Sequence, residues 1–156
     1  MAAEPATHHL PDLQTRWPDH GRGARAYLGG GTAYSATDYV QAQRVRRVGQ
    51  KAVAQLFGQV DLVVTPPCST GAFAIADTKP TRIVEVMRGL HTQYWNSLGN
   101  PALSVPRGFT TAGLPLGMQI AGAPFDEATV LRVDDAYQQR TDRHLRPPAI
   151  TQTVAA

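Results

Sequence analysis

Residues 35 to 57 carry apolar and basic side chains with the repeat of an α-helix. Apolar positions recur three or four residues apart, and basic positions fall on the other side. Ser35 followed by Asp38 resembles a capping box, and Gly58 closes the pattern. The spacing predicts an amphipathic helix that packs on a sheet. Its apolar positions are Ala42, Val45, Val48, Ala52 and Leu56, and its basic positions include Arg44, Arg47 and Lys51.

A short apolar run follows this helix at residues 61–66, between Gly58 and Pro67. A continuous apolar run of this length is typical of a strand buried on both faces, as in parallel sheets. We therefore expect a strand at Leu62–Thr65. A helix, a short link and a buried strand make half of a crossover unit, and the first strand of such a unit is not found in these residues.

Two further strands are expected at residues 102–105 and 118–121. Gly99 ends a preceding helix. Pro106 is expected to stop the first strand, because proline removes a donor from the ladder. The turn at residues 111–115 contains glycine and proline and suits a chain reversal. The two strands should therefore form an antiparallel pair.

Three other helices complete the predicted elements. One begins with Thr81 as its cap and runs to Trp95, and one begins at Asp126 and ends near Arg140. A shorter helix near the amino terminus is expected to stop at Gly29. The apolar residues along the first of these helices are Ile83, Val84, Met87, Leu90 and Tyr94.

The connecting segments suggest a division of the chain. Residues 67–80 are expected to form a long loop, with Phe73 and Ile75 as its anchors. We predict an extended or short-helical segment at residues 1–34, the main domain at 35–148 and a loose tail at 149–156.

Composition narrows the classes of function. Apolar residues make up 42% of the chain, enough for a core, but charged residues only 17%. Typical globular chains have roughly 25% charged residues, so the low value is mild evidence for a missing partner or half. The net charge is +3. The basic cluster Arg44, Arg46, Arg47 and Lys51 fits a solvated helix face better than a nucleic-acid site, and no nucleic-acid partner is expected.

Cys68 is the one cysteine, so an internal disulfide is excluded and no cysteine metal cluster is offered. The sequence has no apolar run near 18 residues and no signal-peptide pattern at its amino terminus. We expect no membrane partner, no cofactor and no metal, and a cytoplasmic location.

Residues 96–122 carry a long ordered motif. It reads N-x-x-G-x-P-A-L-S-V-P-x-G-F and then G-L-P-x-G-x-Q-I-x-G. This motif resembles the carboxy-terminal part of the amidase signature family, one member of which is a component of glutamyl-tRNA amidotransferase. The resemblance extends from about His8 to Pro148. It implies an α/β fold class, the C-terminal portion of the amidase signature fold, with a partial mixed sheet packed by helices.

The resemblance also implies a chemistry. The family hydrolyses carbon–nitrogen amide bonds with a Lys-Ser-Ser triad, whose serines lie in a Gly/Ser-rich stretch. No such stretch occurs in these residues, and neither Lys51 nor Lys79 precedes one. We therefore expect the chain to correspond to the carboxy-terminal third of an amidase, to lack the catalytic core and to be inactive alone. No catalytic residue is assigned. The serines of the chain are Ser35, Ser69, Ser97 and Ser104.

Other readings of the function stay open. A partner chain could carry the missing core, which would make this chain one half of a split amidase. The chain could instead be a non-catalytic binding or scaffold domain, or a truncated gene product. Self-association is expected if the strand at Leu62–Thr65 lacks neighbours, because its ladder groups and apolar surface would then be exposed.

Most other polar residues are expected to be structural or solvated. Cys68 with a histidine elsewhere would make a nucleophile pair, but no orienting acid is near it in sequence, and an idle role is favoured. Adjacent helical carboxyls point about 100° apart and cannot share a proton. Gly29 to Gly31 lacks the spacing of a phosphate loop and is interpreted as a flexible joint. The residues concerned also include His8, His9, His20, His91, Asp134 and Asp135.

Three residues are predicted to approach a substrate pocket. Thr65 and Pro66 end the buried strand, and ligands in such sheets collect outside the carboxyl ends of strands. Gln119 is a polar residue within an apolar run, and it resembles a family position. A hydrogen bond to neighbouring backbone is the favoured role for Gln119, and a place in the pocket wall is the alternative.

Overall fold

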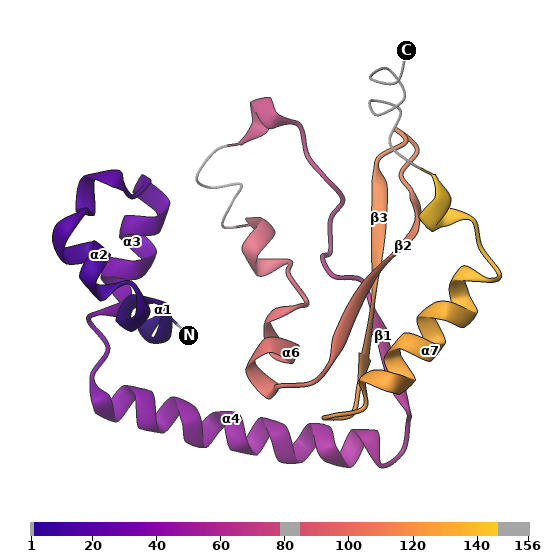
Figure 1. Ribbon diagram of the computed structural model, residues 1–156, viewed down its shortest axis with the longest axis horizontal. Helices are drawn as coiled ribbons and strands as arrows, with labels where there is room; N and C mark the ends of the chain where they lie inside the picture. The colour runs from indigo at the N-terminus through magenta and orange to yellow at the C-terminus, as the bar shows by residue number, and fades with distance from the viewer. Residues whose placement is uncertain (1, 79–84, 147–156) are drawn as a thin grey trace. The chain divides into compact units, whose positions relative to one another are not determined.

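A computed structural model describes residues 2–78 and 85–146, in which three antiparallel strands form one sheet (Figure 1). The strands are β1 (Leu62–Thr65), β2 (Ala102–Phe109) and β3 (Pro115–Gly122). Their order in the sheet is β1-β3-β2, so β3 is central and the other two strands are edges. The predicted α/β class is confirmed, and every strand pair in the described residues is antiparallel.

The core of the sheet lies between its central strand and one helix, α7 (Glu127–Gln138) (Figure 1). Val105, Ile120 and Val130 are buried there, and Ile120 is only 1% exposed. Full burial of a side chain of this size stabilises the folded state by about 1.5–3 kcal/mol. Leu62, Leu103, Met118, Val133 and Tyr137 pack around this centre.

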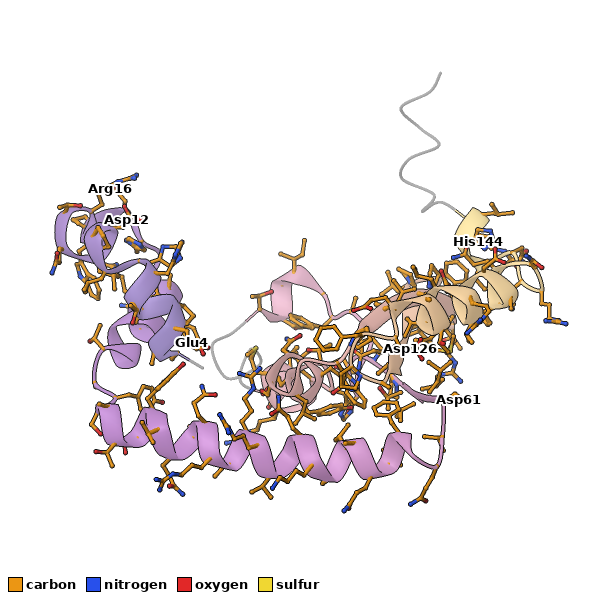
Figure 2. The ribbon with its side chains drawn as sticks, turned by 60° about the horizontal axis from the view of Figure 1, so that its bottom comes forward. Glu4, Asp12, Arg16, Asp61, Asp126 and His144 are labelled. Atoms are coloured by element: carbon orange, nitrogen blue, oxygen red, sulfur yellow. The ribbon has the colours of Figure 1, made fainter. Side chains whose placement is uncertain are left out.

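The beginning of α7 agrees with its predicted cap. Asp126 Oδ1 accepts hydrogen bonds from the backbone N–H of Thr129 at 3.4 Å and from its hydroxyl at 2.7 Å. Figure 2 shows Asp126 where the chain enters this helix. The carboxylate satisfies a donor that the first turn leaves unpaired. The helix ends at Gln138, two residues before the predicted end near Arg140.

Two of the strand predictions are wrong in detail. Leu62–Thr65 forms a strand as predicted, but it pairs antiparallel with β3, and Val64 is 54% exposed. Pro106 does not end β2, which continues to Phe109. The register shifts between Pro106 and Gly108, so the strand accommodates the proline with a bulge. An edge strand tolerates this because its outer side has no ladder partner in the described residues.

Contact analysis divides the chain into two compact units, Met1–Val48 and Gly49–Ala156. The first unit contains α1 (Ala3–His8), α2 (Leu10–Thr15), a 3₁₀ turn η1 (Trp17–Asp19) and α3 (Arg22–Gly31). The prediction that Gly29 stops a helix is wrong, and so is the flexible joint at Gly29 to Gly31, because α3 includes all three glycines. A Cβ on Gly31 would lie 2.8 Å from the Cβ of Ala6, so this glycine permits close contact between α3 and α1.

The long helix α4 (Ala36–Phe57) forms where the apolar repeat predicts it. The backbone N–H of Asp38 donates to Ser35 Oγ at 3.1 Å, and the N–H of Ser35 donates to Asp38 Oδ2 at 3.0 Å, which confirms the capping box. Burial of its apolar stripe is not confirmed. No described residue of α4 is buried, and Val45 and Val48 are 61% and 69% exposed.

The predicted helix from Thr81 to Trp95 is wrong as one continuous element. Its start, including Thr81 and Lys79 before it, lies outside the described residues, and residues 85–88 are helical. The chain then turns and makes a β-bridge at Leu90 before α6 (Gln93–Leu98) begins. Gly99 ends α6 with φ of 81°, as predicted for a left-handed cap.

The segment before it is only partly anchored. Phe73 is half-buried, but Ile75 is 92% exposed in the short turn η2 (Ile75–Asp77), so the prediction that Ile75 anchors the loop is wrong. The predicted loose tail lies outside the described residues. None of the described helices combines the length and the apolar character that crossing a membrane requires.

Candidate functional site

Two adjoining hollows lie where β1 ends. The smaller has a volume of about 250 Å³ and is lined by Val64, Thr65, Pro66, Arg107, Gly117 and Met118. The larger has a volume of about 320 Å³ and extends along the loop of residues 66–72 to residues 115–117 of β3, with Arg107 again in its wall. Pro66, Arg107 and Gly117 line both hollows. We call the two together the strand-end groove.

Gly117 determines how closely the strands and the loop approach here. A Cβ at this position would lie 3.1 Å from Pro67 Cγ and 3.3 Å from Ser104 Oγ. Any larger residue would therefore push against the loop that forms the opposite wall. The glycine of the G-L-P-x-G motif thus has a packing reason in this structure.

The loop is held by a short ladder to the segment that follows the 85–88 helical turn. The Ser69 N–H donates to the Gly89 carbonyl at 2.9 Å, and the His91 N–H donates to the Pro67 carbonyl at 2.9 Å. Cys68 lies opposite Leu90 in this bridge. Residues about twenty positions apart are thereby brought together beside the groove.

Gln119 lies behind this ladder in the central strand and is 4% exposed. Its Nε2 donates to Thr65 Oγ1 at 3.4 Å and to the His91 carbonyl at 3.3 Å. It therefore links the end of β1 to the segment that holds the loop. Of the predicted pocket residues, Thr65 and Pro66 line the groove, whereas Gln119 does not appear in either wall. A role in substrate binding stays a prediction for all three.

Ser69 and His91 form a side-chain pair that the sequence did not reveal. Ser69 Oγ lies 2.8 Å from His91 Nε2, and which atom donates depends on the histidine tautomer. A hydroxyl beside an imidazole is the first requirement of a serine nucleophile, and a third group that orients the base is the next. In the part of the chain described, no carboxylate bonds to the other ring nitrogen. No local motif joins these two residues, so only the fold could show the pair.

The cysteine has a different partner from the one that a nucleophile pair would need. Cys68 Sγ lies 3.6 Å from Thr70 Oγ1. Hydrogen bonds from the backbone N–H of Thr70 and then from its hydroxyl lower the pKa of the Cys68 thiol below its ordinary value. His91 bonds to Ser69 instead. The residues with a thiol or hydroxyl in this loop are therefore close to one another without forming a Cys–His pair.

The other residues considered from sequence lie away from the groove. His9 Nδ1 is 3.8 Å from Asp12 Oδ2 in the first unit, and no group of three or more metal-ligating residues occurs among the residues described. Asp134 and Asp135 accept hydrogen bonds from different side chains, Gln138 and Gln139, so they do not form a dyad. Lys51 is exposed on α4 and is not a lining residue.

Comparison with known proteins identifies the relatives of this chain. The family model described as Amidase matches residues 18–131. The chain is 46% identical over 110 residues to the first subunit (GatA type) of glutamyl-tRNA(Gln) amidotransferase of Chloroflexus aggregans, which is 70% of this chain and 22% of that protein. It is 38% identical over 111 residues to the corresponding protein of Myxococcus xanthus, which is 71% of this chain and 23% of the relative.

Solved structures give the same picture. A vestigial protein complex linked to the origins of an s-triazine catabolic enzyme superposes with a TM-score of 0.79 at 28% identity, over 94% of this chain and 33% of that chain. The corresponding amidotransferase protein from Thermotoga maritima superposes with a TM-score of 0.57 at 29% identity, over 78% of this chain and 27% of that one. The chain thus spans about a quarter to a third of the proteins it matches, and it belongs to the amidase family.

Proposed function

We propose that this chain supplies one wall of the substrate cleft of an amidase-family protein that hydrolyses a carbon–nitrogen amide bond. The observation that carries the proposal is the match over residues 18–131, together with the small share, 22%, of a whole relative that the chain covers. Within these residues the strand-end groove is the concave surface nearest to the end of β1, where ligands of such sheets collect.

The nucleophile is proposed to lie outside these 156 residues. The chain contains no Gly/Ser-rich stretch, and the exposed pair of Ser69 and His91 lacks an orienting acid among the described residues. An activated nucleophile needs its base held in place, and it needs donors for the oxyanion. By itself, therefore, the 156-residue chain should not release ammonia or amine from simple amides.

A chimera tests this proposal. The matched segment of the Chloroflexus aggregans relative is replaced by this chain, and amide hydrolysis is compared with that of the intact relative and of the isolated chain. We expect the chimera to hydrolyse amides and the isolated chain to be inactive. A second chimera with Gly117→Leu, which fills the groove, should fold but lose kcat/KM. Enzymatic turnover by the isolated chain, or full activity of the Gly117→Leu chimera, would contradict the proposal.

A partner chain is proposed as the source of the missing core in the native setting. The names of the relatives describe a protein complex and one subunit of an amidotransferase, which makes assembly a reasonable expectation for this chain also. Affinity purification from the native cell should recover an amidase-family chain that carries a Gly/Ser-rich stretch. Recovery of this chain as a monomer without such a partner would argue against a split amidase.

The second candidate function is a binding domain without turnover. The groove favours it to this extent: its walls hold a cation and several hydroxyl groups but no lysine. A ligand that binds near residues 65–75 of the native protein and is recovered unchanged would support this function. Conversion of that ligand would favour the enzyme.

A further inference from the structure

We propose that the strand-end groove is an anion site in which Arg107 binds the carboxylate of a small ligand. Arg107 is the one charged residue among the described residues that line either hollow, and it lines both. Within residues 2–78 and 85–146, no carboxylate lies in ion-pair distance of its guanidinium. The groove therefore presents an uncompensated positive charge between walls that are otherwise neutral.

The fold places Arg107 in this wall by a specific device. The register of β2 against β3 shifts between Pro106 and Gly108, so Arg107 is the extra residue of a bulge. Bulges change the direction of a side chain relative to a regular strand, and they occur often beside binding sites. The backbone at this point is also held, because the Tyr137 hydroxyl donates to the Arg107 carbonyl at 3.3 Å.

The chemistry of the wall favours a carboxylate. A guanidinium offers a planar fork of donors that matches the two oxygens of one carboxylate. Ser69 and Thr70, which line the larger hollow, can add hydroxyl contacts. A single cation balances a single negative charge, whereas a phosphate dianion would leave one charge without a partner. The ligand class is therefore a small molecule with one carboxylate.

This inference deepens the proposed function, and it rests on that function only where the ligand is taken to be a substrate. In that case the substrate is an amide that also carries a carboxylate. The anion site itself is tested without catalysis, so its failure and the failure of the amidase proposal are separate results.

Cys68 provides the reporter, because it lines the same hollow as Arg107 and is the one cysteine of the chain. We compare the alkylation rates of the full chain with iodoacetate, which is an anion, and with iodoacetamide, which is neutral. The ratio of the two rates cancels the fraction of thiolate and reports the local potential. Unit charges roughly 8 Å apart at a protein surface change such a ratio by about two- to sixfold.

Arg107→Gln should therefore lower the iodoacetate-to-iodoacetamide ratio by about two- to sixfold at low salt, and Arg107→Lys should keep most of it. Arg140→Gln is the matched control, because it removes an exposed arginine that does not line the groove, and its ratio should equal that of the unchanged chain. Adding salt to about 0.5 M should abolish the difference, since charges are then screened within a few ångströms. In urea, all variants should give one common ratio.

Binding is then measured by protection of Cys68 from iodoacetamide at constant ionic strength. N-Acetylglycine should slow labelling of the unchanged chain but not of Arg107→Gln, and neutral N-acetylglycinamide should slow neither. An unchanged rate ratio in Arg107→Gln would overturn the site. Lack of protection by N-acetylglycine would do the same, and equal protection by sulfate would overturn its assignment to a carboxylate.

Discussion

Replacement of Gln119 by methionine tests how the strand-end groove is supported. Gln119 is buried, and its Nε2 donates to Thr65 Oγ1 and to the His91 carbonyl. Methionine has a similar length and no donor, so the packing volume is kept while both hydrogen bonds are lost. The segment that holds the loop of residues 66–72 would then lose its link to the central strand.

The expected cost follows from the geometry. Bonds of 3.3 and 3.4 Å are long, so each contributes near the low end of the usual range, about 0.5 kcal/mol. Removal also leaves the His91 carbonyl without this donor in a part-buried place. The sum is about 1–2 kcal/mol, which corresponds to a roughly 5- to 30-fold increase in local opening.

Hydrogen exchange of individual amides measures this opening. The amides of Ser69 and His91 should exchange faster in Gln119→Met, because they form the short ladder beside the groove. The amide of Leu103 in β2 should change less. Ser104→Ala is the control, since Ser104 lies opposite Gln119 in the register but makes neither of these bonds. Equal exchange in Gln119→Met and the unchanged chain would refute the reasoning, and a uniform increase over the sheet would show that Gln119 supports global stability instead.

Other contacts make independent predictions. Asp126→Ala should lower the free energy of unfolding by about 1 kcal/mol through loss of the α7 cap, seen as a lower urea midpoint. The hydrogen bonds from Ser35 lower the pKa of Asp38, so its stabilising effect should be complete above the ordinary Asp pKa and be lost as pH falls through the lowered one. Asp38→Asn should remove that part of the acid dependence of helicity. Thr70→Val should move the pH midpoint of Cys68 alkylation upward, because the Thr70 hydroxyl, second to its backbone N–H, lowers the pKa of the thiol.

Local sequence signals predicted the elements whose causes are local. The Ser35 capping box, the Asp126 cap and the left-handed Gly99 were all confirmed, because each depends on hydrogen bonds or dihedral angles within one turn. The prediction failed at Pro106 for a non-local reason. Whether a proline ends a strand depends on whether the strand is an edge, and the order of strands is a property of the whole sheet.

The groove itself was predicted only in part. Thr65 and Pro66 could be named because they follow a recognisable strand. Arg107 could not, because it lines the groove only through a bulge in β2. The contact of Ser69 with His91 also depends on a bridge between two loops, and the apolar pattern near His91 suggested an uninterrupted helix instead. Residues from separate segments meet at the site, and no single segment encodes the meeting.

Phe125 shows a cost that nothing in the described chain repays. Its φ of 65° is left-handed, which costs a non-glycine residue roughly 1 kcal/mol, yet its side chain is 94% exposed. The amidase proposal gives a reason, since the remainder of a whole amidase would cover this ring. In the isolated chain, Phe125→Asn should therefore leave the free energy of unfolding unchanged or raise it by up to about 1 kcal/mol, because asparagine tolerates this backbone. In the chimera, the same change should cost about 3 kcal/mol or more, as for a buried phenylalanine, and should lower the thermal midpoint. Equal effects in the two proteins would show that Phe125 stays exposed in the amidase, and the explanation by a covering partner would then be wrong.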